Sequence, residues 1–124
     1  MNQNFCKLDI KLWKSTPPML IREKDKQTLL HIFSATNYPI EVWAYGSRVN
    51  GSAHEGSDLD LVVRSQNLAP IPLNVFGGLY EKIKESNIPI LVELWDWAHL
   101  PHSFHINIEQ QYEMLFDNRK GFVV

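Results

Sequence analysis

The sequence predicts a small mixed α/β domain in which one β-sheet is packed with helices. Short β-branched and aromatic runs alternate along the chain with apolar stripes at helical spacing. The 44% hydrophobic and 21% charged composition is that of a globular protein. A length of 124 residues suits one domain spanning 1–124.

The first half of the chain predicts three strands and one helix. Residues 7–13 alternate polar and apolar side chains, which is typical of a short strand, and a Ser-Thr-Pro-Pro segment interrupts it. Residues 23–36 carry an apolar stripe at helical spacing. Residues 40–45 are β-branched and aromatic, and residues 58–64 alternate carboxylates with aliphatic side chains, so both predict strands.

The second half predicts two helices around one strand. Apolar side chains of residues 73–86 recur at i, i+3, i+4 and i+7, which indicates a helix, although two adjacent glycines weaken it. Residues 90–95 predict a strand after an Asn-Ile-Pro turn. Residues 103–116 predict a final helix, with an uneven stripe. The tail at 117–124 is compatible with a closing strand or with a loose end.

Composition excludes several classes of protein. The lone Cys6 excludes a disulfide framework and a thiol-rich zinc site, and fits a reducing cytoplasm. No apolar run approaches the ~20 residues that span a bilayer, and the N-terminus lacks a secretion signal. A net charge of −2 argues against nucleic acid as the partner. We therefore expect a soluble cytoplasmic domain.

The most informative segment begins where the strand at 40–45 ends. Gly46 lacks a Cβ and lets the backbone approach a ligand closely. Ser47 is predicted to begin a short helix, where its hydroxyl and the free backbone N–H groups can hold a phosphate. Arg48 adds a charged donor. These three residues are the predicted nucleotide-binding residues.

Two aspartates follow ten residues after Ser47. Asp58 and Asp60 are two positions apart on a predicted strand, so their side chains leave the same face of the sheet. The ten intervening residues allow a short helix and a reversal that returns this strand beside the first. Two carboxylates beside a phosphate-binding turn are what a hard cation such as Mg²⁺ requires.

These motifs together resemble the signature of the polymerase β superfamily of nucleotidyltransferases, in particular the minimal nucleotidyltransferase family of MntA-like antitoxins that pair with HEPN toxins. The family pattern of Gly-Ser, ten residues and Asp-x-Asp is matched without a gap. The segment Val-Glu-Leu-Trp-Asp-Trp-Ala at 92–98 is similar to the third strand of the family. The resemblance covers the middle and later parts of the chain, and implies a polymerase β-like nucleotidyltransferase fold.

The resemblance implies a Mg²⁺-dependent transfer of AMP from ATP to a tyrosine hydroxyl of the HEPN toxin encoded nearby. Asp58, Asp60 and Glu93 would be the catalytic metal ligands for two ions, with Mn²⁺ as an alternative to Mg²⁺. Glu93 stands where the family usually has aspartate, so its carboxylate reaches further. Because larger relatives use a second domain to bind the acceptor, we expect another polypeptide, or another copy of this chain, to supply that surface.

Alternatives to this interpretation stay open. Glu93 would be merely exposed if its strand were a sheet edge. Asp96 is expected to cap the next segment or to face solvent. The trio of His99, His102 and His105 is interpreted as a polar loop or rim rather than a zinc site, since a proline interrupts it.

Two further questions concern the tryptophans and catalysis itself. Trp43, Trp95 and Trp97 are expected in the core, although one of them near the site would be able to flank an adenine ring. The alternative function is a catalytically degenerate nucleotide-binding module that neutralises its partner by stoichiometric binding.

Overall fold

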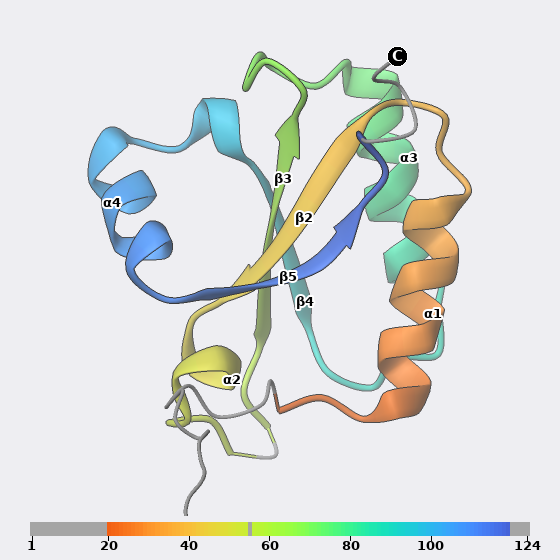
Figure 1. Cartoon of the computed structure of the whole chain (residues 1–124). Helices are drawn as coiled ribbons and strands as arrows, with labels where there is room; N and C mark the ends of the chain where they lie inside the picture. The colour runs from red at the N-terminus through yellow and green to blue at the C-terminus, as the bar shows by residue number, and fades with distance from the viewer. Residues whose placement is uncertain (1–19, 55, 120–124) are drawn as a thin grey trace, which may run out of the picture.

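A four-stranded mixed sheet organises the domain (Figure 1). The computed structural model describes residues 20–54 and 56–119. The strands stand in the order β4-β3-β2-β5, with bounds β2 Ile40–Tyr45, β3 Leu59–Ser65, β4 Val92–Asp96 and β5 Tyr112–Asp117. β2 pairs antiparallel with β3 and β5, whereas β3 pairs parallel with β4. The predicted mixed α/β class is confirmed.

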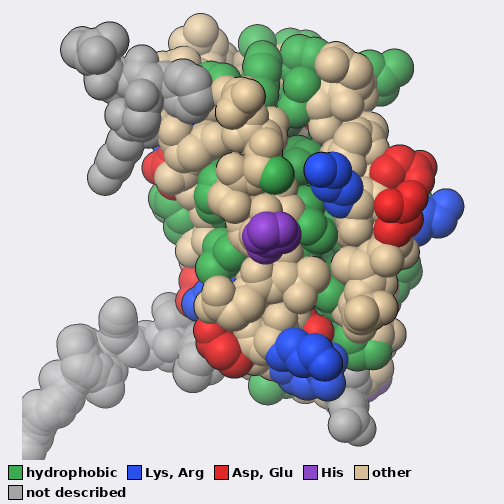
Figure 2. Space-filling model, turned by 90° about the vertical axis from the view of Figure 1, so that its right-hand side faces the viewer, with side chains coloured by type: hydrophobic (Ala, Val, Ile, Leu, Met, Phe, Trp, Pro, Cys, Tyr) green, Lys and Arg blue, Asp and Glu red, His purple; other side chains and the backbone are tan. Residues whose placement is uncertain are grey.

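One face of the sheet is covered by two long helices. α1 (Glu23–Ser34) and α3 (Leu73–Lys84) lie side by side on it (Figure 1). The main core lies between these helices and the inward side chains of β2 and β3, since alternate residues of a strand face one side. The residues of β3 that face this core, Leu59, Leu61 and Val63, are fully buried. On the outer surface of the helices, side chains of both charge signs are interspersed, with hydrophobic side chains between them (Figure 2).

The opposite face is only partly covered, by η2 (Trp97–His99) and α4 (His102–Gln110). A second apolar cluster joins Trp43 and Val62 of the sheet to Trp97 and Ile108 of this cover. The guanidinium carbon of Arg64 lies 4.0 Å from the centre of the Trp43 ring and 4.5 Å from that of Trp97. This cluster fixes α4 over one half of the face, and the other half carries the candidate site.

The predicted elements are largely confirmed, with ends shifted by two residues or fewer for the strands at 40–45, 58–64 and 90–95 and for the helices at 23–36 and 73–86. A short helix, α2 (Ser47–Asn50), follows β2 as expected. The predicted strand at 7–13 lies outside the described residues.

The predicted helix at 103–116 is wrong in its second half, because α4 ends at Gln110 and β5 begins at Tyr112. Ile108 packs in the cluster under α4, whereas Leu115 packs in the main core on the other side of the sheet. One straight helix cannot reach both sides. As a strand, the segment instead satisfies the backbone groups along the second edge of β2. The closing strand is therefore β5, which precedes the predicted tail at 117–124.

The tryptophans divide between core and surface. Trp43 and Trp97 are buried at 5% and 4% exposure, as predicted. Trp95 is 45% exposed, so its placement in the core is wrong. Trp95 lies on β4, which is an edge strand of the sheet. α4 does not cover the face of β4 from which Trp95 projects. Within the described residues, no helix is long and apolar enough to cross a membrane.

Candidate active site

A row of polar side chains crosses the uncovered half of the sheet. Asp60 on β3 stands directly opposite Tyr45 on β2 and directly beside Glu93 on β4. Residues in register on neighbouring strands project from the same face of the sheet, so these three side chains lie in one line. Asp58 precedes β3 by one residue, is exposed, and alternates onto the same face. The strand register therefore gathers the three carboxylates that the sequence singled out.

Like charges face one another in this row. Partial burial, followed by the neighbouring charges of Glu93 and Asp58, raises the pKa of Asp60 from its ordinary 3.8 to about 6. Among the described residues, no lysine or arginine forms an ion pair with Asp60 or Glu93. The row therefore favours a bound cation or a proton.

Tyr45 belongs to the site although the sequence did not single it out. Burial, with added repulsion from Asp60 and Glu93, raises the pKa of Tyr45 to about 12, so its hydroxyl remains protonated at neutral pH. A usable signal was its position just before Gly46, at the end of a strand that pairs antiparallel with the aspartate strand. That register places Tyr45 opposite Asp60.

Gly46 is required where β2 passes into α2. Its φ of +83° and ψ of −156° lie in a region that is essentially restricted to glycine. A Cβ at this position would lie 2.5 Å from Asp60 Oδ2, so the missing side chain is what lets this backbone approach the carboxylate. The group approached inside the protein is an aspartate, and the predicted close approach of a ligand to Gly46 stays a prediction.

Ser47 opens α2 beside this glycine. The backbone N–H groups of Val49 and Asn50 both donate to the carbonyl of Gly46 at 3.0 Å, which holds the turn. Ser47 itself is half-buried. Phosphate binding by Gly46 and Ser47 stays a prediction.

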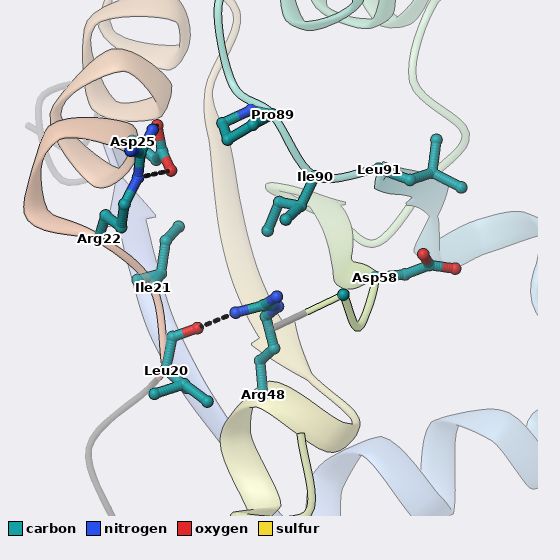
Figure 3. Close-up of a pocket in the computed structure, with 10 residues that line it drawn as sticks. Leu20, Ile21, Arg22, Asp25, Arg48, Asp58, Pro89, Ile90 and Leu91 are labelled. Atoms are coloured by element: carbon teal, nitrogen blue, oxygen red, sulfur yellow. Dashed lines mark hydrogen bonds and ion pairs between the residues drawn. The ribbon is translucent and has the colours of Figure 1, made fainter. Parts of the chain in front are cut away.

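Arg48 is buried, with 6% exposure, and holds three segments together. Its guanidinium donates to the carbonyls of Leu20 at 2.7 Å, Ser57 at 2.9 Å and His54 at 3.3 Å. These contacts fix the loop before Asp58 to α2 and to the segment before α1 (Figure 3). They support a positioning role for Arg48, and its contact with nucleotide stays a prediction.

A pocket of about 830 Å³ lies beside Arg48. Its walls combine apolar side chains such as Ile21 and Ile90 with the ion pair between Arg22 and Asp25, which measures 2.9 Å. The carboxylate of Asp58 is turned away from Arg48 at its rim (Figure 3).

The other polar residues near β4 serve local structure. Asp96 is buried, accepts hydrogen bonds from the backbone N–H groups of Ile71 at 2.9 Å and Ala98 at 3.1 Å, and so caps η2 as predicted. His99 Nδ1 lies 3.3 Å from Asp96 Oδ2. The His105 ring stacks on Trp97, and its Nε2 lies 2.7 Å from the Trp97 carbonyl oxygen.

The carboxylate row suits Mg²⁺ by its chemistry. Within the part of the chain that the structure describes, no group of three or more His, Cys, Asp or Glu side chains is arranged to hold a metal ion by itself. Mg²⁺ commonly binds through one or two carboxylates and completes its coordination with water and substrate phosphates. The mutual repulsion around Asp60 supplies a reason for such a cation to bind here.

Comparison with known proteins agrees with this geometry. The family described as Polymerase beta, Nucleotidyltransferase matches residues 27–121. A relative from Haemophilus influenzae, named "Probable protein adenylyltransferase MntA", is 38% identical over 79 residues, which cover 64% of this chain and 68% of the relative.

Two solved structures share the fold. A crystal structure of a toxin-antitoxin with AMP-PNP superposes with a TM-score of 0.59 at 19% identity, covering 82% of this chain and 77% of that one. A crystal structure of the toxin-antitoxin MntA-HepT gives 0.55 at 13% identity, covering 81% and 76%. At these identities the similarity concerns the fold.

The first prediction concerns Gly46. Gly46→Ala should lower the free energy of unfolding by about 1–3 kcal/mol, because alanine is strained at this φ and ψ and its Cβ meets Asp60. Gly78→Ala is the matched control, since a Cβ at this helical position meets nothing within 4 Å, and it should add about 0.5–1 kcal/mol. Urea unfolding measures both, and equal effects would contradict the close approach.

The second prediction concerns the charge of Asp60. Because its pKa is raised on folding, the ionised carboxylate opposes folding above about pH 6 and no longer does so below about pH 4. Without added metal, Asp60→Asn should therefore stabilise the protein at pH 7.5 by about 1 kcal/mol, a value reduced for solvent screening. The gain should shrink towards pH 4.

Glu113→Gln provides the control for Asp60→Asn, because this half-exposed carboxylate of β5 lies opposite Ala44 and outside the row. Its effect on stability at pH 7.5 should stay near zero. An Asp60→Asn protein that is less stable than wild type at pH 7.5 would contradict the claim that burial and repulsion of the ionised Asp60 carboxylate oppose folding.

Proposed function

The chain belongs to the polymerase β nucleotidyltransferase family and is an MntA-like nucleotidyltransferase, and we propose that it transfers AMP from ATP to a tyrosine hydroxyl of a helical HEPN-type partner. In this proposal the chain is the antitoxin of a toxin-antitoxin pair, and the modification silences the toxin. The observation that carries the chemistry is the register that aligns Asp60 with Glu93 beside the Gly46–Ser47 turn. The adenylyltransferase name of the relative supports AMP as the transferred group.

The proposed reaction exchanges the phosphoanhydride bond between the α- and β-phosphates of ATP for a phosphoester bond to the acceptor. The acceptor oxygen forms a bond to the α-phosphorus of ATP, and the bond from that phosphorus to the bridging oxygen of the β-phosphate breaks. Pyrophosphate leaves, and the hydroxyl proton is released. Such transfers depend mainly on positioning and on stabilising negative charge, rather than on covalent chemistry by the protein.

Each site residue has a role in this proposal. Asp58, Asp60 and Glu93 would hold Mg²⁺, as two ions or with Mn²⁺ in its place, and the bound cation would neutralise phosphate charge. Gly46 and Ser47 would hold the phosphates of ATP at the start of α2.

Two neighbours of the row would support it. Tyr45, protonated at neutral pH, would donate a hydrogen bond within the row. Arg48 would fix the loop that carries Asp58, through the carbonyls it binds.

The edge strand supplies a surface for the acceptor. Trp95 shares one face of β4 with Glu93 and is 45% exposed, and Leu91, directly before β4, is 60% exposed. Exposed apolar side chains beside a catalytic row are typical of a protein-binding surface. We infer that the partner presents its tyrosine across β4, at the Glu93 end of the row.

The direct test is a transfer assay with the protein encoded next to this chain. Incubation of that partner with this chain, ATP and Mg²⁺ should add the mass of one or more AMP groups to the partner, measured by intact-mass spectrometry. EDTA should prevent the addition. If the partner is inactivated without any adduct, stoichiometric neutralisation replaces catalysis as the function.

The third prediction uses variants of the row in this assay. The double change Asp58→Asn with Asp60→Asn should abolish transfer and keep the fold, because both side chains point away from the main core. Glu93→Gln should lower the transfer rate by about tenfold or more with little change in ATP affinity, since positional errors near the reacting atoms are costly.

Glu93→Asp should transfer at a rate between those of wild type and Glu93→Gln. Glu113→Gln, outside the row, should transfer at the wild-type rate. A Glu93→Gln protein with an unchanged rate would remove Glu93 from the site and leave Asp58 and Asp60 alone in it.

A further inference from the structure

A second pocket of about 500 Å³ opens at the opposite end of the carboxylate row from Glu93. It lies where the end of β2 meets α2 and α4, and both Tyr45 and Gly46 line it. Its volume falls within the roughly 300–1,000 Å³ typical of small-molecule sites. The pocket therefore adjoins the predicted phosphate turn and the carboxylates at the same time.

The chemistry of its lining is neutral and rich in amides. Asn50 of α2 and three residues at the end of α4, Asn107, Gln110 and Gln111, supply four side-chain amides, and none of the described residues that line the pocket is charged. Phe104 adds an aromatic ring that is 49% exposed. A neutral lining disfavours a phosphate and suits the uncharged part of a ligand.

The α4 helix presents this lining by its spacing. Phe104, Asn107 and Ile108 recur at i, i+3 and i+4, so they share one side of α4, and Gln111 follows directly after the helix end. Ile108 is 3% exposed and anchors that side to the second apolar cluster. The ring and the amides are thus held on a fixed support at the mouth of the pocket.

The hydrogen-bonding capacity of these amides is largely unused by the described part of the chain. Asn50 Oδ1 accepts from the backbone N–H and hydroxyl of Ser52 at 2.9 and 2.6 Å, which leaves its NH₂ group for a ligand. Within residues 20–54 and 56–119, no hydrogen bond engages the side-chain amide of Asn107, Gln110 or Gln111. Each amide offers both donors and an acceptor, which is the pattern that the edge of a nucleobase requires.

We propose that this pocket binds the nucleoside of the donor nucleotide, with its base stacked on Phe104 and its polar edges bound by the amides. This inference rests on the proposed function, which supplies a nucleoside triphosphate as the donor. Aromatic rings stack on the face of any base, so Phe104 gives affinity and the amides give selectivity. The phosphates then extend past Gly46 toward Asp60.

The larger pocket beside Arg48 is less suited to a base. Its polar groups are already bound within the protein, since Arg48 donates to three carbonyls and Arg22 pairs with Asp25. Its remaining walls are mainly aliphatic. The row itself supports the assignment, because the nucleoside at the Tyr45 end leaves the Glu93 end free for the acceptor.

The fourth prediction compares binding of MgATP with that of Mg-tripolyphosphate, which lacks the nucleoside, by calorimetry. Phe104→Ala should weaken MgATP binding by about fivefold or more and leave tripolyphosphate binding within about twofold of wild type. Ile106→Ala is the matched control, because Ile106 is 46% exposed on the same helix and does not line the pocket. It should change neither affinity. Asn107→Ala should alter the relative affinities for MgATP, MgGTP and MgCTP.

Three results would overturn the assignment. Wild-type affinity for MgATP in both Phe104→Ala and Asn107→Ala would place the nucleoside elsewhere. A parallel loss of MgATP and tripolyphosphate binding in Phe104→Ala would make the ring structural. Equal affinity of the wild-type protein for the two ligands would show that the nucleoside makes no contact.

A separate result tests the proposed function. A wild-type protein that binds neither MgATP nor Mg-tripolyphosphate would refute that function, and this inference with it.

Discussion

The partial burial of Asp60, together with its repulsion from the neighbouring carboxylates, is the constraint on which the site depends. The parallel register of β3 and β4 sets Asp60 beside Glu93. Neither strand can turn its carboxylate away, because the side chains on its opposite face are buried in the main core. Leu59 and Leu61, on either side of Asp60, are fully buried in the main core. Hydrophobic burial on one face thus holds like charges together on the other. A cation bound between these carboxylates would offset their unfavourable electrostatic energy.

Another carboxylate on the same face of the sheet, Glu41, is neutralised by ion pairs within the protein. Glu41 is buried at 3% exposure and pairs with Arg64 at 2.7 Å and with Arg119 at 2.8 Å. That end is neutralised by the protein's own arginines and closed by the second apolar cluster, whereas the Asp60 end has no such partner among the described residues. The sheet is therefore divided into a structural half and a half left for ligands, with α4 standing at the boundary. This division explains why one small sheet can hold both a core and a charged site.

Local patterns were enough to predict most of the fold and part of the site. The turn at Gly46 and the aspartate strand carry strong local signals, and the predicted helix start is found there. Tyr45 required the antiparallel register, which a single strand cannot specify. The strand β5 was mistaken for helix because an uneven apolar stripe suits both, and the open edge of β2 decides between them. Arg48 shows a related limit, since carbonyls close to it only in the folded chain determine what it binds.

The most direct test of the central claim is the titration of Asp60 itself, followed by carbon-13 NMR of its side-chain carboxyl group. Without metal the pKa should be near 6, reflecting burial and the charges of Glu93 and Asp58. With saturating Mg²⁺ and a non-hydrolysable ATP analogue, the pKa should fall below its ordinary 3.8, because a bound cation favours the ionised carboxylate. An Asp60 pKa that stays near 6 with the nucleotide and Mg²⁺ bound would contradict the claim that this carboxylate holds the cation.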